Sequence, residues 1–451
     1  MAAVDRPVAV VTLFLLQVFT VGAGAGVVKI TPERELSPRP ASVAHREIVV
    51  PDKTTQGIAD TRVSGAQLAA KLAKLDPDGR IIGVVLDGAT RQSLFDARSG
   101  QAAVPASTTK IVTSTAVLAA LDPSARMTTR VVSKDGRLVL VGGGDPTLSS
   151  QDDPKSYPEP ASVADLARET AEALKANGTT RITVDYDASL YSGSSLGPGW
   201  KPTYFTEGSV APVSALMVDN GRVAPNPCEG TLAPVEDGPK HATQVFVQWL
   251  KRYGVKAAVG RPGSGEGGQK VADVQSPPVS ALVEHLMDCS DNDVSEALAR
   301  QVALKKGLPA SFDGAAQAVR GVLQSLGVAQ GVDTRDGSGL SPLNRITPLG
   351  LAKMISMNAL GDRAELRTVI TGMPVAGFSG TLAARFLGTP GAGVVRAKTG
   401  TLNHVATLAG VIMHKNGRLL TFAFMANGVE DLGAARAVLD RLATAVATCD
   451  C

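Results

Sequence analysis

Three short segments contain the side chains that could carry chemistry. In the first, Ser107 and Lys110 are three positions apart, so on a helix they share one face. An apolar site disfavours the charged form of a lysine, and the neutral amine can then take the proton of a nearby serine hydroxyl. This segment therefore predicts an activated serine nucleophile with Lys110 as its general base.

The second segment is Ser290-Asp291-Asn292, which the surrounding pattern places between two helices. We expect Ser290 to pass a proton between Lys110 and the leaving amine of a substrate. We expect Asn292 to offer its amide to a substrate carbonyl. The same three residues also make a good helix cap, so their chemical interpretation depends on the other two segments.

The third segment, Lys398-Thr399-Gly400, ends a predicted strand and is followed by Thr401. Lys398 can supply positive charge for a substrate carboxylate, and Gly400 has no side chain to keep a substrate from the strand edge. The hydroxyls of Thr399 and Thr401 add to this carboxylate site. Each segment is weak evidence alone, but the three in this order indicate a serine acyl-enzyme hydrolase.

The elements that position these segments predict an α+β fold. Ser107 begins a helix that Asp122-Pro123 ends, and helical patterns follow Ser290. The expected core strands are Ile81–Leu86, Val394–Thr399, Ala406–His414 and Arg418–Met425. We expect these strands to form one antiparallel sheet flanked by helices from both chain ends. A helical cluster carrying Ser107 and Ser290 would lie beside the sheet, with the active site between them.

Length and composition indicate a multidomain, exported protein. The chain has 451 residues, 44% of them hydrophobic and 19% charged, and a net charge of +3, which excludes a disordered chain and gives no sign of nucleic-acid binding. An apolar stretch follows Arg6. The predicted parts are a signal peptide or membrane anchor at 1–28, a linker at 29–60, a catalytic domain at 61–148 and 278–451, and an inserted domain at 149–277.

Four cysteines suit an oxidising compartment outside the cytoplasmic membrane. Cys449 and Cys451 are one residue apart, and we expect them to be poorly placed to bond each other. We expect one of them to pair with Cys228 or Cys289 instead. Neither the cysteines nor the five histidines have metal-ligand spacing, so the sequence predicts no metal and no cofactor.

The residues around the three segments sharpen the interpretation, because they resemble the class C low-molecular-mass penicillin-binding proteins. The similar segments are Pro105–Lys110, Gly143–Leu148, Ser290–Asn292 with Glu296-Ala297, Asp336–Ser341, Asn344-Arg345, Thr347-Pro348, Met373–Gly377, Gly380–Leu382 with Arg385, and Arg396–Thr401. The resemblance extends from about Gly65 to the C-terminus. It implies a penicillin-binding, β-lactamase-like transpeptidase fold with an inserted domain.

The resemblance also implies an activity and partners. The expected activity is that of a D-alanyl-D-alanine carboxypeptidase and endopeptidase, with peptidoglycan stem peptides as substrates and β-lactam antibiotics as covalent inhibitors. It further implies that the backbone N–H groups of Ser107 and Thr401 form the oxyanion hole. About 180 residues separate Lys110 from Ser290, which leaves room for the insertion.

Other functions remain open at this point. A β-lactamase would use the same acylation but needs a further base for water, and no Glu-x-x-Leu-Asn segment lies between the first two motifs. A catalytically inactive wall-binding relative is a second alternative. Gly193–Gly197 matches the Gly-x-Ser-x-Gly pattern, but Pro198-Gly199 follows where a nucleophile elbow needs a helix. Asp336–Ser341 either borders the active site or only shapes a loop.

Overall fold

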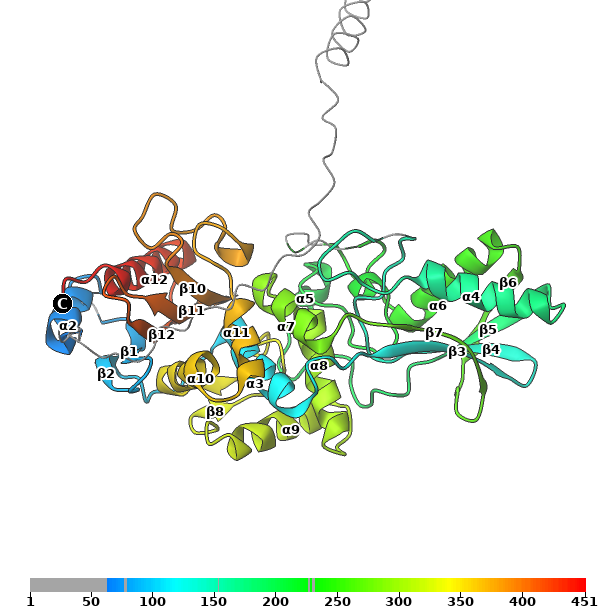
Figure 1. Ribbon diagram of the computed structural model, residues 1–451, viewed down its shortest axis with the longest axis horizontal. Helices are drawn as coiled ribbons and strands as arrows, with labels where there is room; N and C mark the ends of the chain where they lie inside the picture. The colour runs from blue at the N-terminus through cyan, green and yellow to red at the C-terminus, as the bar shows by residue number, and fades with distance from the viewer. Residues whose placement is uncertain (1–62, 77–78, 153, 226–227, 229–231) are drawn as a thin grey trace, which may run out of the picture. The chain divides into compact units, whose positions relative to one another are not determined.

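The computed structural model describes residues 63–451, except 77–78, 153, 226–227 and 229–231 (Figure 1). The predicted signal or anchor at 1–28 and the linker at 29–60 lie outside the described residues. Among the helices that are described, none combines the length and the hydrophobicity that a bilayer crossing requires.

A five-stranded antiparallel sheet forms the centre of the catalytic part. Its strands in spatial order are β10 (Val395–Leu402), β11 (Val405–Met413), β12 (Leu419–Asn427), β1 (Ile81–Asp87) and β2 (Ser93–Ala97). The predicted meander and the strand near Ile81 are thus confirmed as one sheet. β1 pairs with β12, so that Val84 faces Ala423 across the two strands. The first strand of this sheet in sequence therefore pairs with the last one.

Both faces of this sheet are covered, which explains why its central strands are apolar nearly throughout. On one face Phe422 and Phe424 pack with Leu439 and Leu442 of α12 (Leu432–Ala447). Helix α2 (Gly65–Ala73) joins the same cluster, and Figure 1 shows α12 lying along the strands. The opposite face packs on a group of helices.

That helical cluster carries the first two motifs. Its helices are α3 (Thr109–Ala120), α7 (Val279–Asp288), α8 (Asn292–Lys305), α9 (Phe312–Ser325), α10 (Pro348–Leu360) and α11 (Arg367–Thr371). α3 is buried on all sides, including its polar residues. Because α8 begins at Asn292 and α3 begins just after Ser107, the two helix starts bring the motifs together.

A second five-stranded sheet belongs to the insertion. Its strands in spatial order are β6 (Lys256–Pro262), β5 (Arg181–Asp187), β4 (Arg137–Val141), β3 (Thr128–Lys134) and β7 (Gln269–Gln275). Helices α4 (Val163–Ala176) and α6 (Gly238–Arg252) pack on it through Leu166, Phe246 and Leu250. The shorter elements of the chain are α5 (Thr203–Thr206), β8 (Val332–Asp333), β9 (Arg345–Ile346) and several single turns of 3₁₀ helix.

This sheet corrects the predicted boundary of the insertion. The sequence assigns residues 61–148 to the catalytic domain, yet β3 and β4 pair with β7 and β5 of the insertion. Ser276 N donates to Met127 O where the chain leaves and re-enters the catalytic part. The insertion therefore begins near Thr128 rather than at 149. The sequence pattern changes only near Ser149, but the sheet of the insertion also takes in the two strands before that point.

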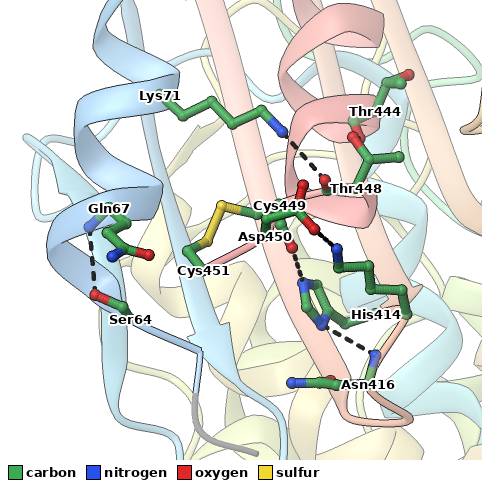
Figure 2. The surroundings of a disulfide bond; sticks show 11 residues. Ser64, Gln67, Lys71, His414, Asn416, Thr444, Thr448, Cys449, Asp450 and Cys451 are labelled. Carbon is green, nitrogen blue, oxygen red and sulfur yellow. Dashed lines mark hydrogen bonds and ion pairs between the residues drawn. A yellow bond between two sulfur atoms is a disulfide. The ribbon is translucent and has the colours of Figure 1, made fainter.

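The predicted disulfide pairing is wrong. Cys228 bonds Cys289, with Cα atoms 4.8 Å apart, and Cys449 bonds Cys451, with Cα atoms 5.1 Å apart. The tail pair forms because α12 ends at Ala447, and the chain after it is no longer helical. Figure 2 shows this bond beside His414, whose Nε2 lies 3.0 Å from Cys449 O. Lys71 of α2 donates to Thr448 O, which joins the two ends of the described chain.

Candidate active site

The structure brings Ser107 and Lys110 together at the start of α3. Ser107 lies in a turn of 3₁₀ helix (Ala106–Thr108) and remains partly exposed, whereas Lys110 is completely buried. Ser107 Oγ and Lys110 Nζ are 3.2 Å apart. A reachable hydroxyl therefore stands beside an amine that is shielded from water.

The partners of Lys110 determine what its amine can do. Asn292 Oδ1 lies 2.6 Å from Nζ and the carbonyl oxygen of Ser338 lies 2.7 Å away. Both are acceptors, so they take the two N–H groups of a neutral amine and leave its lone pair for the Ser107 hydroxyl. Burial lowers the pKa of Lys110 to about 8, although nearby carboxylates, Asp336 first among them, oppose this. The surroundings thus favour a base rather than a permanent cation.

The loop Asp336–Ser341 borders this site. Gly339 has a φ of +88°, and a Cβ there would lie 2.0 Å from Ala106 O, so the loop can approach the nucleophile only with glycine at that position. Glu296 of α8 accepts the N–H groups of Gly337 and Ser338 at 3.0 and 2.8 Å. The buried Glu296 thereby fixes the carbonyl that holds Lys110.

Ser290 forms no hydrogen bond with Lys110 in the described part of the chain, and the expected proton transfer between them stays a prediction. Ser290 Oγ instead accepts a hydrogen bond of 2.8 Å from Lys398 Nζ, and Lys398 also donates to the carbonyl of Thr399 at 3.1 Å. Lys398 is completely buried, and burial together with the Lys110 ammonium lowers its pKa well below the usual value for lysine. Sequence reasoning gave Lys398 only the role of supplying positive charge for a substrate carboxylate, and its contact with Ser290 joins residues 108 positions apart.

Asn292 is engaged by the protein itself. Its Nδ2 donates to Ser209 O of the insertion at 2.7 Å, while its Oδ1 faces Lys110. Nearby, Arg222 of the insertion forms a buried ion pair of 2.6 Å with Asp293. The insertion therefore holds the start of α8 in place, in addition to any contact that Asn292 makes with a substrate.

The third motif lies against the nucleophile. Gly400 of β10 is buried, and a Cβ at this position would lie 3.0 Å from Ser107 N and 2.8 Å from Pro105 O. The hydroxyl of Thr399 donates to Thr381 at 2.9 Å. Thr401 Oγ1 accepts a hydrogen bond of 3.1 Å from Arg436 of α12. All three motifs thus converge, with hydroxyls at the strand end.

Two residues of the site have strained backbones. Ala106, directly before the nucleophile, has φ of +48°, and Ser290 has φ of +59°. The left-handed region costs a residue with a side chain about 1–3 kcal/mol, so it persists only where surrounding contacts impose it. Here the strain falls on the first two motifs, directly before Ser107 and at Ser290 itself.

Comparison with known proteins agrees with this geometry. The model of the D-Ala-D-Ala carboxypeptidase 3 (S13) family matches residues 65–231 and 226–447. The chain belongs to this family. A carboxypeptidase of Mycobacterium tuberculosis is 36% identical over 429 residues, covering 92% of this chain and 89% of the relative. Family membership makes the protein a serine-type D-Ala-D-Ala carboxypeptidase, as the motifs predict.

Solved structures share the fold. Penicillin-binding protein 4 of Haemophilus influenzae matches with a TM-score of 0.68 at 23% identity, over 85% of this chain and 98% of that one. The same protein in complex with a β-lactam matches with a TM-score of 0.65 over the same shares, also at 23% identity. The penicillin-binding, β-lactamase-like α+β fold is thereby confirmed.

Some residues of the site escape sequence reasoning. The sequence indicates Glu296 only through the family resemblance and gives it no role, and it gives no role to Arg436. Cys289 precedes Ser290, and its disulfide partner Cys228 comes from the insertion. His285 Nε2 lies 3.2 Å from the carboxylate of Asp291, within the second motif. The disulfide and the contact of Arg436 join separate elements of the chain, so no local pattern could reveal them.

Proposed function

We propose that this protein cleaves D-alanyl-D-alanine bonds in peptidoglycan stem peptides through an acyl-enzyme on Ser107. One observation carries the proposal above all: a partly exposed serine hydroxyl lies 3.2 Å from the buried amine of Lys110. The two N–H groups of that amine have acceptors, which leaves its lone pair for the serine proton. No metal or cofactor is required for this acylation.

The other motif residues have roles that follow from their contacts. Asn292 and the Ser338 carbonyl orient the base. Ser290, held by Lys398, lies in the site as a donor to the leaving nitrogen. The backbone N–H groups of Ser107 and Thr401 serve as the oxyanion hole. Gly400 lets the substrate lie along β10 next to Ser107.

The substrate side of the proposal rests on the hydroxyls at the strand end. Thr399 and Thr401 flank Gly400 and suit a carboxylate on the carbon next to the scissile nitrogen. A terminal D-alanine carries that group, and so does the D-centre of a cross-linking diamino acid. The site can therefore support both carboxypeptidase and endopeptidase activity. β-Lactams, which one structural relative binds, would acylate the same serine.

The location of the substrate places the protein outside the cytoplasmic membrane. The apolar stretch after Arg6 would direct its export, either as a cleaved signal peptide or as a retained anchor. Mass spectrometry of the N-terminus of the exported protein separates these two cases.

Covalent labelling with a fluorescent penicillin tests the proposed function. Ser107→Ala should abolish labelling while leaving the thermal unfolding temperature nearly unchanged. Lys110→Arg should also fail to acylate, because a guanidinium stays charged at any working pH. Labelling that persists in Ser107→Ala, or acylation of Lys110→Arg within a few-fold of the unchanged enzyme, would contradict the assignment.

A further inference from the structure

The lysine of the third motif is already engaged by the protein. Lys398 is buried, and its amine donates to Ser290 Oγ and to the carbonyl of Thr399. Burial and the nearby Lys110 also lower its pKa, which weakens it as a cation. A substrate carboxylate at the strand end therefore gains from a second, exposed cation.

A guanidinium lies at the C-terminal end of β10, the end that carries the third motif. Arg436 of α12 donates to Thr401 Oγ1 at 3.1 Å, one residue after the glycine that would touch Ser107 N. Its remaining N–H groups are exposed, and within the described part of the chain no carboxylate pairs with it. Because Thr401 accepts from Arg436, the threonine hydroxyl keeps its own proton to donate.

The other arginines of this region already have partners. Arg396 of β10 donates to the carbonyls of Thr371 and Met373, at the far end of the strand. Arg385 forms an ion pair with Asp440. Arg436 differs from both, because within the described residues its side chain donates only to the hydroxyl of Thr401, which follows the third motif.

We propose that Arg436 is a specificity-determining residue that binds the free carboxylate of the substrate together with Thr401. The guanidinium is charged at every working pH and has planar N–H pairs that match a carboxylate. Lys398 then acts on Ser290 rather than on the carboxylate. This inference rests on the proposed function, because it names the group by which the enzyme recognises its peptide.

The test crosses two variants with two substrates. We would measure kcat/KM for a peptide ending in D-alanyl-D-alanine and for its C-terminal amide, with the unchanged enzyme, Arg436→Gln and Arg436→Lys. Arg441→Gln is the matched control, since Arg441 is an exposed arginine of the same helix. Thermal unfolding of each variant confirms that it is folded.

The expected result is selective. The unchanged enzyme should prefer the free acid by at least about tenfold, since an amide forfeits a charge-assisted pair. Arg436→Gln should lower kcat/KM for the acid about ten- to a hundredfold and leave the amide nearly unchanged, and Arg436→Lys should restore part of the loss. Arg441→Gln should match the unchanged enzyme with both peptides.

Two results would overturn the inference: an equal loss for acid and amide, which means that Arg436 only positions β10, or no loss for either. Failure of the proposed function looks different, since the unchanged enzyme would then hydrolyse neither peptide. In that case we would measure the Kd of both peptides for Ser107→Ala and for the double variant Ser107→Ala, Arg436→Gln. This compares acid and amide without hydrolysis. Equal weakening of both peptides there also overturns the role of Arg436.

Discussion

At the scale of single residues, the proposed acylation depends on the neutral form of the buried Lys110. The pKa of Lys110 is lowered to about 8, first by burial, so the amine is protonated below that pH and free above it. A protonated amine has no lone pair for the Ser107 hydroxyl. The rate of acylation by penicillin should therefore rise with pH up to about 8 and then level off, which a pH profile of the second-order labelling rate measures.

Asn292 offers a way to move that profile. Asn292→Asp keeps the size of the side chain but places a carboxylate 2.6 Å from Lys110 Nζ, where it stabilises the ammonium and raises the lysine pKa. We expect the profile of this variant to shift to higher pH and the labelling rate at pH 7 to fall at least about tenfold. A profile unchanged in position would show that Lys110 does not limit acylation.

At the scale of elements, the backbone of β10 packs tightly against the start of α3. In Gly400→Ala the new methyl group would lie 2.2 Å from Thr407 Oγ1 and 3.0 Å from Ser107 N, so strand and helix must separate. We expect labelling to slow at least about tenfold. Gly321→Ala is the control, because no atom lies within 4 Å of the added carbon, and an exposed helical alanine should stabilise by about 0.5–1 kcal/mol.

Helix α8 and the loop Asp336–Ser341 act as a second pair of elements. Glu296→Gln keeps an acceptor oxygen for Gly337 N and Ser338 N, whereas Glu296→Ala leaves these two buried donors unpaired at about 1–3 kcal/mol each. We expect Glu296→Ala to lose acylation and to unfold at lower temperature. Glu296→Gln keeps the loop contacts but turns an amide N–H towards Arg300, which donates to the second carboxylate oxygen at 3.3 Å, so we expect it to keep acylation and to lose stability. Equal acylation by the two variants would show that the loop does not support Lys110.

At the scale of the whole molecule, the two disulfides should contribute unequally to stability. Cys228–Cys289 closes a loop with a sequence separation of 61, and Cys449–Cys451 one with a separation of 2. The entropy of loop closure grows with loop length, which gives about 4 kcal/mol for the first and about 1.5 kcal/mol for the second. Urea unfolding of Cys228→Ser and Cys449→Ser measures both, and an equal loss would contradict the loop argument.

The sequence predicts the candidate catalytic residues because the proposed chemistry demands fixed spacings. Ser107 and Lys110 must share a helix face, and the strands that hold Lys398 show a clear apolar pattern. Roles that depend on long-range contacts stay hidden. Two of these contacts, between Lys398 and Ser290 and between Asn292 and Ser209, join residues more than 80 positions apart. The contact of Arg436 with Thr401 joins a helix to a strand. The predicted boundary at 149 leaves out β3 and β4 for the same reason, since the sequence of a strand does not identify the strand with which it pairs.

The pairing of β1 with β12 has a consequence for how the chain reaches its fold. β1 ends at Asp87, but its partner begins only at Leu419, so the first strands emerge from the ribosome long before their neighbour exists. Such distant pairing slows folding and leaves an unpaired edge in the meantime. The catalytic sheet thus cannot close until nearly the whole chain is available. A chain that stays open this long is suited to crossing a membrane unfolded and to assembling its active site on the far side.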